Sequence, residues 1–285
     1  MTPNLIKSEP LNYLVIGHIT VDKTNKGITL GGTAAYSGLT ADALGLRSGL
    51  ITSFNSDLDV SPLQDLSIYN ITSKNNSIFE NISNGIDRQQ FLYSTAEKIK
   101  SDNMPNIAVQ PDILHLGPVA NEVDPNILDI FPASLKCLTP QGWFRKKSKD
   151  NQVIRHTWQN YQDFLPKADI AVLSLEDVSH NEDLIADMAS LTPVFVVTEN
   201  QKGARIYWRN EAKFLSAPEV KYKNDTGAGD IFSTAFFYQY FYTKDPWEAG
   251  RFAVKLASWS VSRKYLDSIP TADEIIKAKT ELIGN

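Results

Sequence analysis

The sequence has little of what marks a secreted, membrane-bound or nucleic-acid-binding protein. Cys137 is its one cysteine in 285 residues, so a disulfide-stapled domain is excluded. No apolar run approaches the roughly 20 residues of a membrane span, and residues 1–10 lack the apolar core of a signal peptide. Lysine and arginine number 28 against 33 acidic residues, which argues against nucleic acid as the main partner. We therefore expect a cytoplasmic chain that binds neither nucleic acid nor a membrane.

Short apolar runs alternate with helical patterns along the chain. Continuous apolar runs occur at residues 13–16, 49–52, 113–116, 170–173 and 194–197. Such runs are typical of parallel strands that are buried on both faces. Helical patterns lie at 33–44, 125–130, 181–190 and 231–242, and Thr271 and Glu274 form a capping box that opens a last helix. The alternation predicts one α/β domain over residues 1–285, with a mostly parallel sheet.

Two excursions interrupt this alternation, at about 21–30 and 76–95. The second contains two alternating segments joined by Asn84-Gly85, which is a strong hairpin signal. The first has Asn25-Lys26-Gly27 at its tip. The pattern leaves two interpretations open: the excursions form a small β lid over the strand ends, or they are surface hairpins without a role.

The segment with the clearest chemistry is residues 224–232, with the sequence NDTGAGDIF. Its glycines allow a tight turn and a close backbone approach to a ligand. The helix that follows presents unpaired N–H groups, which suit a phosphate. Asp230 beside that phosphate is suited to act as a base that takes a proton from a hydroxyl. Alternatively, the segment is a glycine-rich turn and Asp230 an ordinary first-turn helix residue.

A second glycine-rich segment, Gly31-Gly32, precedes a helix of small residues. By itself it fits either a ligand-binding hinge or a plain loop. Both segments together, with α/β alternation between them, resemble the PfkB, or ribokinase-like, carbohydrate kinases. The resemblance covers nearly the whole chain. It implies a three-layer ribokinase-like fold and transfer of a phosphoryl group from ATP to a sugar-like hydroxyl, with magnesium (Mg²⁺) and often a stimulating monovalent cation.

The resemblance also implies roles for individual residues. Asp230 matches the catalytic base, and the amides of Gly227, Ala228 and Gly229 match the anion hole beside Thr226. Asp22 matches the acceptor of a substrate hydroxyl, with Gly31 and Gly32 as the substrate-side hinge. Thr198 and Gly203 match the nucleotide-side pattern, and the adenine is expected against the segment after Thr198 and the C-terminal helices. Ser174 and Asp177 stand where the family has an Asn-x-x-Glu pair near Mg²⁺ and phosphate.

Several positions depart from the family pattern. Asn224 replaces an aspartate that helps to hold the monovalent cation, so dependence on potassium (K⁺) is in doubt. Asn200 stands in place of a glycine, Ser174 in place of an asparagine, and Asp177 is shorter than the usual glutamate. Tyr36 stands where ribokinases proper have an asparagine against the sugar, and the first excursion is short. These last two differences argue against ribose as the substrate.

A narrower resemblance, to myo-inositol kinases, rests on two segments, HLGPVANEV at 115–123 and TPQGWFR at 139–145. Gln141 could hydrogen-bond a polyol in both directions, and Arg145 could contact substrate or phosphate. Arg145 could equally be a solvated cation, because three lysines follow it closely.

Other chemistry is excluded or weak. No Gly-x4-Gly-Lys-[Ser/Thr] motif is present, so a P-loop kinase is excluded. The histidines show no metal-ligand spacing, and Cys137 is expected to be a buried packing residue.

We therefore expect an ATP-dependent kinase for a small polyol or sugar, with a myo-inositol-like substrate favoured. Two alternatives stay open: a kinase for a nucleoside or another sugar, and a ligand-binding regulator with weak catalysis. Because lid strands of this family pair between subunits, a homodimer through the lid is also open.

Overall fold

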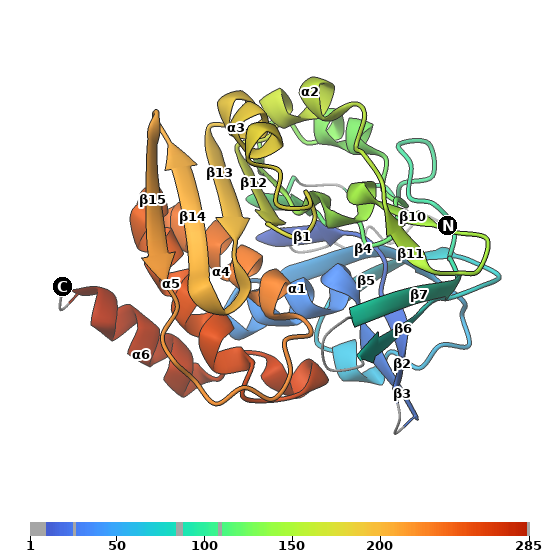
Figure 1. Cartoon of the computed structure of the whole chain (residues 1–285). Coiled ribbons are helices and arrows are strands. Elements are labelled where there is room, and N and C mark those ends of the chain that lie inside the picture. Colours follow the sequence, from blue (N-terminus) through green and yellow to red (C-terminus); the bar gives the residue numbers. More distant parts are fainter. Residues whose placement is uncertain (1–9, 25–26, 84–87, 108–109, 284–285) are drawn as a thin grey trace, which may run out of the picture.

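The computed structural model describes residues 10–24, 27–83, 88–107 and 110–283. Its centre is a nine-stranded sheet in the order β15-β14-β13-β12-β9-β8-β1-β4-β5 (Figure 1). The strands are β1 (Tyr13–Ile16), β4 (Ser48–Phe54), β5 (Ser67–Thr72), β8 (Ile113–Leu116), β9 (Leu135–Leu138), β12 (Ile170–Ser174), β13 (Val194–Thr198), β14 (Gly203–Trp208) and β15 (Glu211–Ser216). The strands from β13 to β5 are parallel, and β14 and β15 form an antiparallel edge. The predicted mostly parallel sheet is therefore confirmed.

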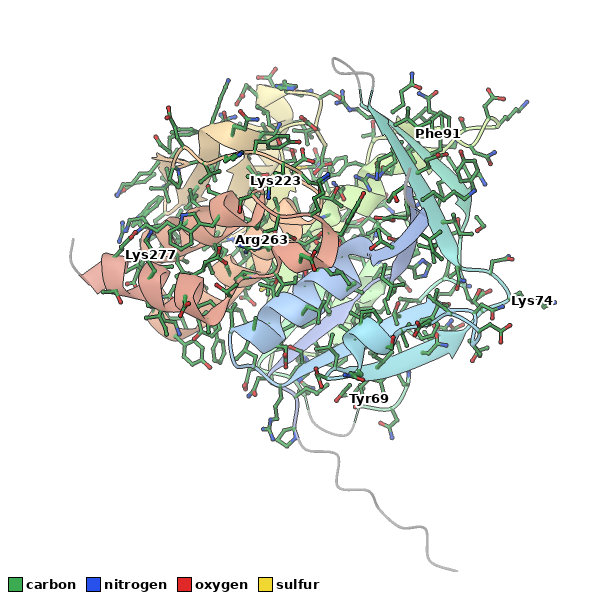
Figure 2. The ribbon with its side chains drawn as sticks, turned by 90° about the horizontal axis from the view of Figure 1, so that it is seen from below. Tyr69, Lys74, Phe91, Lys223, Arg263 and Lys277 are labelled. Carbon is green, nitrogen blue, oxygen red and sulfur yellow. The ribbon has the colours of Figure 1, made fainter. Side chains whose placement is uncertain are left out.

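Helices cover both faces of this sheet, which gives three layers (Figure 1). One face carries α1 (Gly32–Ala43), α4 (Ala228–Thr243) and α5 (Pro246–Ser260), and α6 (Ala272–Ile283) packs outside α5. The other face carries α2 (Tyr161–Phe164), α3 (Glu182–Leu191) and four 3₁₀ segments, η2 (Pro125–Ile130), η3 (Pro140–Phe144), η4 (Leu165–Lys167) and η5 (Asn200–Lys202), of which η5 joins β13 to β14. Figure 2 shows the width of the molecule, with Lys277 of α6 at one end and Lys74, in the turn before the lid, at the other.

The two cores follow from the alternation of side chains along buried parallel strands. In β1, Tyr13 and Val15 pack in the core beneath α1, α4 and α5, whereas Leu14 and Ile16 pack in the core beneath η2 and α3. Both pairs are fully buried. A strand with two apolar faces satisfies both layers at once, which is why its sequence is a continuous apolar run.

A separate four-stranded sheet forms the predicted lid, in the order β3-β2-β6-β7. Its strands are β2 (Thr20–Thr24), β3 (Gly27–Gly31), β6 (Ser77–Ser83) and β7 (Arg88–Ser94). The turn residues Asn25-Lys26 and Asn84-Gly85 lie outside the described residues. Strand β2 of the first excursion pairs in parallel with β6 of the second. The two excursions therefore form one sheet, as the lid interpretation requires.

A two-stranded ribbon, β10 (Arg145–Lys147) and β11 (Val153–Arg155), lies beside the lid. Phe91 of β7 forms an antiparallel bridge with Gln152, and Leu92 N–H donates to the Asn151 carbonyl at 2.8 Å. Lys147 Nζ also donates to the Tyr93 carbonyl at 2.8 Å. The ribbon is thus tied to the lid edge.

One predicted feature differs in detail. The segment predicted as a helix at 125–130 is the 3₁₀ helix η2, capped by Asp124, whose carboxylate accepts from Asn126 N–H at 3.0 Å. Within the part of the chain that the structure describes, no helix has both the length and the apolar character needed to cross a membrane.

Candidate active site

A cavity of about 350 Å³ lies at the carboxyl ends of the central strands, under the lid. It sits beside β1 and β8, where the strand order reverses, and open α/β sheets bind ligands at such switch points. Among the sequence-predicted site residues, those lining it are Asp22, Gly32, Tyr36, Gln141, Arg145, Ser174, Asp177, Thr198, Thr226, Gly227, Gly229 and Asp230. Gly31, Ala228 and Gly203 are not among the described lining residues.

Asp230 stands in the first turn of α4, at the floor of this cavity. The pKa of its carboxyl is raised to about 6, chiefly by burial and in addition by the negative charges of Asp22 and Asp177. A hydrogen bond from Thr33 and the charge of Arg145 act in the opposite direction. A carboxylate with a pKa near neutrality is well matched to accepting a proton from a hydroxyl.

The turn before α4 requires glycine at position 227. Gly227 has φ +84°, and a Cβ there would lie 2.3 Å from the ring of Tyr36. The predicted anion-hole amides divide into two groups. Ala228 N–H donates to the Asp225 carbonyl at 3.0 Å, which closes the turn, whereas Gly227 and Gly229 line the cavity. Tyr36 therefore acts as a wall behind the turn, with its ring buried.

The acceptor side of the cavity is built around Asp22, on strand β2 of the lid. Thr20 Oγ1 donates to Asp22 Oδ1 at 2.7 Å and fixes the carboxylate. A Cβ on Gly31 would lie 2.4 Å from Asp22 Oδ2, so Gly31 makes room for this side chain without lining the cavity itself. Gly32, with φ +83°, turns the chain from the lid into α1 at a point where a Cβ would lie 2.4 Å from the His18 carbonyl oxygen.

Three side chains from two segments, Asp177 after β12 and Gln141 and Arg145 in the segment 139–145, meet on the opposite wall. Asp177 Oδ2 accepts from Ser174 N–H at 2.9 Å, directly after β12. Burial raises the pKa of the Asp177 carboxyl, while the charge of Arg145 and a hydrogen bond from Gln141 lower it. Arg145 also donates to the Val119 carbonyl at 3.3 Å, so it is held over the cavity and is not a freely solvated cation.

The donor side differs from the expectation for a nucleotide site. Thr198 and Thr226 line the cavity, but no described residue at 199–224 or beyond 233 does so. Gly203 begins β14, where a Cβ would lie 1.9 Å from the Leu215 carbonyl oxygen, so it serves the β14–β15 hairpin. Asn200 has φ +52° and donates to Glu176 at 2.8 Å. The described residues that line the cavity therefore do not extend into the segments where an adenine was expected.

The carboxylates fit a magnesium ion only in part. Glu176 and Asp177 line the cavity close to the turn that precedes α4. No group of three or more potential ligand side chains that could hold a metal occurs in the described part of the chain. Mg²⁺ usually keeps several waters and is bound by one or two carboxylates plus substrate phosphates. Asp177 with Glu176 therefore suits an ion that arrives with its phosphates.

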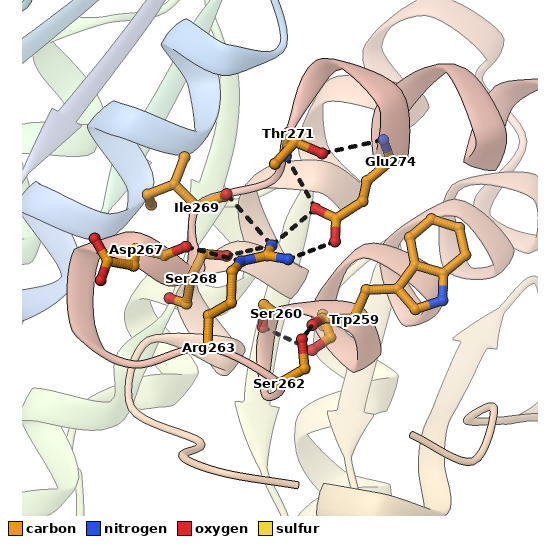
Figure 3. A network of polar contacts seen from close by, with 10 residues as sticks. Trp259, Ser260, Ser262, Arg263, Asp267, Ser268, Ile269, Thr271 and Glu274 are labelled. Carbon is orange, nitrogen blue, oxygen red and sulfur yellow. Dashed lines mark hydrogen bonds and ion pairs between the residues drawn. The ribbon is translucent and has the colours of Figure 1, made fainter. Parts of the chain in front are cut away.

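The loop after α5 carries a network of polar contacts centred on Arg263 (Figure 3). The Val261 carbonyl accepts from Lys223 N–H and Asn224 N–H at 2.8 and 3.1 Å, which joins this loop to the start of the NDTGAGDIF segment. The Arg263 guanidinium donates to the carbonyls of residues 267, 268 and 269 and to both carboxylate oxygens of Glu274. Glu274 in turn forms the predicted capping box with Thr271. Here a side-chain cation orders the loop.

Sequence reasoning did not single out several polar lining residues. Those missed are Thr20, Thr33, Asn81, Gln90, Thr139, Arg155, Glu176, Asp225 and Ser233. Asn81 and Gln90 face each other across the lid hairpin, with Gln90 Nε2 donating to Asn81 Oδ1 at 3.0 Å. The alternation of polar residues along the lid strands could have identified Asn81 and Gln90 as lining residues. The other missed residues line the cavity only because the fold brings separate strand ends together.

Comparison with known proteins agrees with this geometry. Residues 120–272 match the model of the pfkB family carbohydrate kinases. The sequence has no significant match among curated proteins. Among solved structures, a pyrophosphate-dependent kinase in the ribokinase family, complexed with a pyrophosphate analog and myo-inositol, is 19% identical, with 93% of this chain and 99% of that chain covered and a TM-score of 0.79.

Two further structures have the same fold. A pyrophosphate-dependent myo-inositol-1 kinase converted into a myo-inositol-3 kinase is 18% identical, with coverages of 94% and 98% and a TM-score of 0.78. Ribokinase from Thermotoga maritima is 18% identical, with coverages of 95% and 99% and a TM-score of 0.74. The family model spans more than half of the chain, and the fold agrees over nearly all of it. The chain belongs to the pfkB family of carbohydrate kinases and is a phosphotransferase with the ribokinase-like fold.

Proposed function

We propose that this kinase phosphorylates a hydroxyl of a small polyol, with a cyclitol of the myo-inositol type favoured, and that Asp230 is the base. The observation that carries the proposal is the shared cavity of Asp230 and Asp22 next to the Gly227 turn. One carboxylate can take the proton of the attacking hydroxyl while the other accepts a hydrogen bond from a neighbouring hydroxyl. A polyol with hydroxyls on adjacent carbons supplies both the attacking hydroxyl and its neighbour.

Each residue of the cavity then has a distinct role in the reaction. As the hydroxyl oxygen attacks the phosphorus, its proton passes to Asp230 and the bond from phosphorus to the leaving oxygen breaks. The amides of Gly227 and Gly229 face the charge on the transferred group, and Arg145 adds a positive charge to the same cavity. Bound Mg²⁺ would supply further charge neutralisation, held by Asp177 and Glu176 together with the phosphates.

The polar groups of the cavity favour a cyclitol over a nucleoside. Asn81, Gln90 and Gln141 offer amide groups that both donate and accept, as a ring of hydroxyls requires. Tyr36 is the large aromatic residue nearest the turn, but its ring packs against Gly227. Two structural neighbours, one complexed with myo-inositol and one described as a myo-inositol kinase, support the same substrate class.

The donor has two candidates, ATP and pyrophosphate, and one observation favours pyrophosphate. No described residue at 199–224 or after Ser233 lines the cavity, although an adenine was expected there, whereas Arg145 and Arg155 both line it. These arginines are direct cross-strand partners in the β10–β11 ribbon. Two guanidinium groups and a small cavity suit a compact polyanion. The pyrophosphate-dependent neighbours point the same way.

A matrix of donors and acceptors tests the proposal. Magnesium complexes of ATP, ADP, GTP and pyrophosphate are each combined with myo-inositol, other cyclitols, pentoses, hexoses and nucleosides, and phosphomonoester formation is followed by ³¹P NMR. We expect turnover with a cyclitol, lost in Asp230→Asn. Asp183→Asn is the matched control, because Asp183 also stands in the first turn of a helix but lies outside the cavity.

Each outcome of the matrix has a definite meaning. Turnover with a pentose or nucleoside alone refutes the cyclitol assignment. Binding of donor and polyol without phosphomonoester formation favours the regulator. For the donor, Arg155→Ala should raise the KM for pyrophosphate about tenfold without changing the KM for the acceptor. Lys149→Ala is the matched control, because it removes a positive charge that lies outside the cavity. Better turnover with ATP than with pyrophosphate refutes the donor assignment.

A further inference from the structure

A chain of buried polar side chains runs from the centre of the sheet to the cavity. Tyr13 of β1 and His115 of β8 are both fully buried. His115 Nδ1 lies 2.8 Å from Tyr13 Oη, and His115 Nε2 lies 2.8 Å from Thr139 Oγ1. Tyr13 Oη also lies 3.3 Å from Thr234 Oγ1 on α4, one turn after Asp230. Thr139, directly after β9, is the member of the chain that lines the cavity.

An imidazole at this depth is costly unless both ring nitrogens are hydrogen-bonded, and here both are. Burial lowers the pKa of His115 to about 3, so the ring is neutral wherever the enzyme works. A neutral imidazole has one nitrogen that donates and one that accepts. The tautomer of His115 therefore decides which way every hydrogen bond of the chain points.

Tyr13 selects one of the two tautomers. A phenol is a better proton donor than the N–H of a neutral imidazole, so Tyr13 O–H donates to Nδ1. Thr234 O–H can then donate to Tyr13 Oη. The proton of the ring is left on Nε2, which donates to Thr139 Oγ1. His115 thus occupies one of the two acceptor lone pairs of Thr139 Oγ1 and leaves the threonine proton available for another oxygen.

We propose that Thr139 donates a hydrogen bond to a hydroxyl oxygen of the acceptor substrate, and that Tyr13 and His115 hold it in this donor role. Thr139 is then a specificity-determining residue, and the two buried residues are positioning residues. Two other polar groups of the cavity differ in kind, since the Asp22 carboxylate only accepts and the Gln141 amide does both. The inference rests on the proposed function, because it assumes that the polyol occupies this cavity.

The first test replaces the threonine itself, with myo-inositol as the probe. Thr139→Val removes the hydroxyl and keeps the shape, and we expect the KM for myo-inositol to rise about tenfold, with kcat and the KM for the donor within threefold of wild type. Thr139→Ser restores the hydroxyl and should restore the KM. An unchanged KM in Thr139→Val overturns the proposal.

The second test addresses the buried pair. Nitrogen-15 NMR of the histidine side chains, with His115→Gln to assign the signal, should show protonated Nε2 and bare Nδ1. Tyr13→Phe removes the selecting donor and should raise the KM for myo-inositol three- to tenfold. Phe195→Leu, a core substitution on β13, controls for lost stability and should lower the unfolding midpoint without changing the KM. Protonated Nδ1 overturns the proposal, because Thr139 would then donate to His115.

These readouts separate the inference from the function on which it rests. If wild-type protein neither binds nor phosphorylates myo-inositol, the cyclitol assignment fails. The Thr139 variants are then measured with the acceptor that the donor and acceptor matrix identifies. The tautomer is measured in the protein without substrate, so it supports or overturns the hydrogen-bond direction in either case.

Discussion

Replacing Asp230 by asparagine should make the folded protein more stable while abolishing turnover. Burial raises the pKa of the Asp230 carboxyl from 3.8 to about 6. An acidic group whose pKa is raised by folding is destabilising when it is ionised. The penalty is therefore absent below about pH 4, grows between pH 4 and pH 6, and is complete above pH 6. Asparagine has nearly the same shape and never carries the charge.

The size of the effect follows from the shift. About two pKa units correspond to roughly 3 kcal/mol at neutral pH. Solvent reaches this carboxyl through the open cavity, so we expect about 2 kcal/mol. For a chain of this length that stabilisation corresponds to a rise in the unfolding temperature of roughly 4 °C. The asparagine amide oxygen can keep a contact with the Thr33 hydroxyl, and its NH₂ group can donate to water in the open cavity.

Urea unfolding at a series of pH values between 4 and 7.5 measures this directly. The difference in unfolding free energy between Asp230→Asn and wild type should be near zero at pH 4 and about 2 kcal/mol in favour of the variant at pH 7.5. Asp183→Asn, at the start of α3, should instead lower stability slightly, because it removes a charge that favours a helix N-terminus. A destabilised Asp230→Asn protein, or a difference that does not change with pH, would refute the reasoning.

Three further predictions follow from the same site. Because Asp230 must be ionised to act as base, kcat/KM should fall tenfold per pH unit below about pH 6, and a limb near pH 4 would contradict the assignment. Gly227→Ala should destabilise by about 1–3 kcal/mol in urea unfolding, because φ is +84° and the new Cβ meets the Tyr36 ring, whereas Gly229→Ala, whose Cβ meets nothing within 4 Å, should not destabilise. Replacing KCl by tetramethylammonium chloride should leave kcat unchanged, because Asn224 stands where the family pattern has the aspartate that helps to hold the cation, and activation by K⁺ would contradict this.

Much of the fold was predictable because buried parallel strands have a local signature. The runs that became β1, β8, β12 and β13 are apolar at almost every position, and each was found within one residue of its bounds. Two sheet strands lacked that signature. β9 has Lys136 in its middle, whose N–H donates to Asp169 Oδ2 at 2.8 Å. β5 is an edge strand with half-buried and exposed residues.

Other omissions have a different origin. β14 and β15 pair antiparallel and have polar faces, so their pattern does not distinguish them from a surface hairpin. The helix α5 carries regular helical spacing at Ala249, Phe252 and Leu256 and was predictable from it. The lid was visible as two excursions, but their pairing through β2 and β6 is a long-range contact that no local pattern contains.

The chemistry of the NDTGAGDIF segment is local, so the sequence alone specifies it. A glycine with positive φ, followed by a helix start and a first-turn aspartate, needs only neighbouring residues to form, and the turn and the helical position of Asp230 follow from that. The other groups of the cavity come from positions 22, 145 and 177, separated by long stretches of chain. Their approach depends on the order of strands in the sheet.

The electrostatics and the hydrogen-bond directions belong to the tertiary structure as well. The raised pKa of Asp230 requires burial among groups that are distant in sequence. His115 reads in the sequence as a histidine without metal-ligand spacing. Only the packing of β1, β8 and α4 brings Tyr13 and Thr139 to its two nitrogens. Short-range geometry could specify the turn and the base, whereas desolvation and contacts between distant residues arise only when the chain is folded.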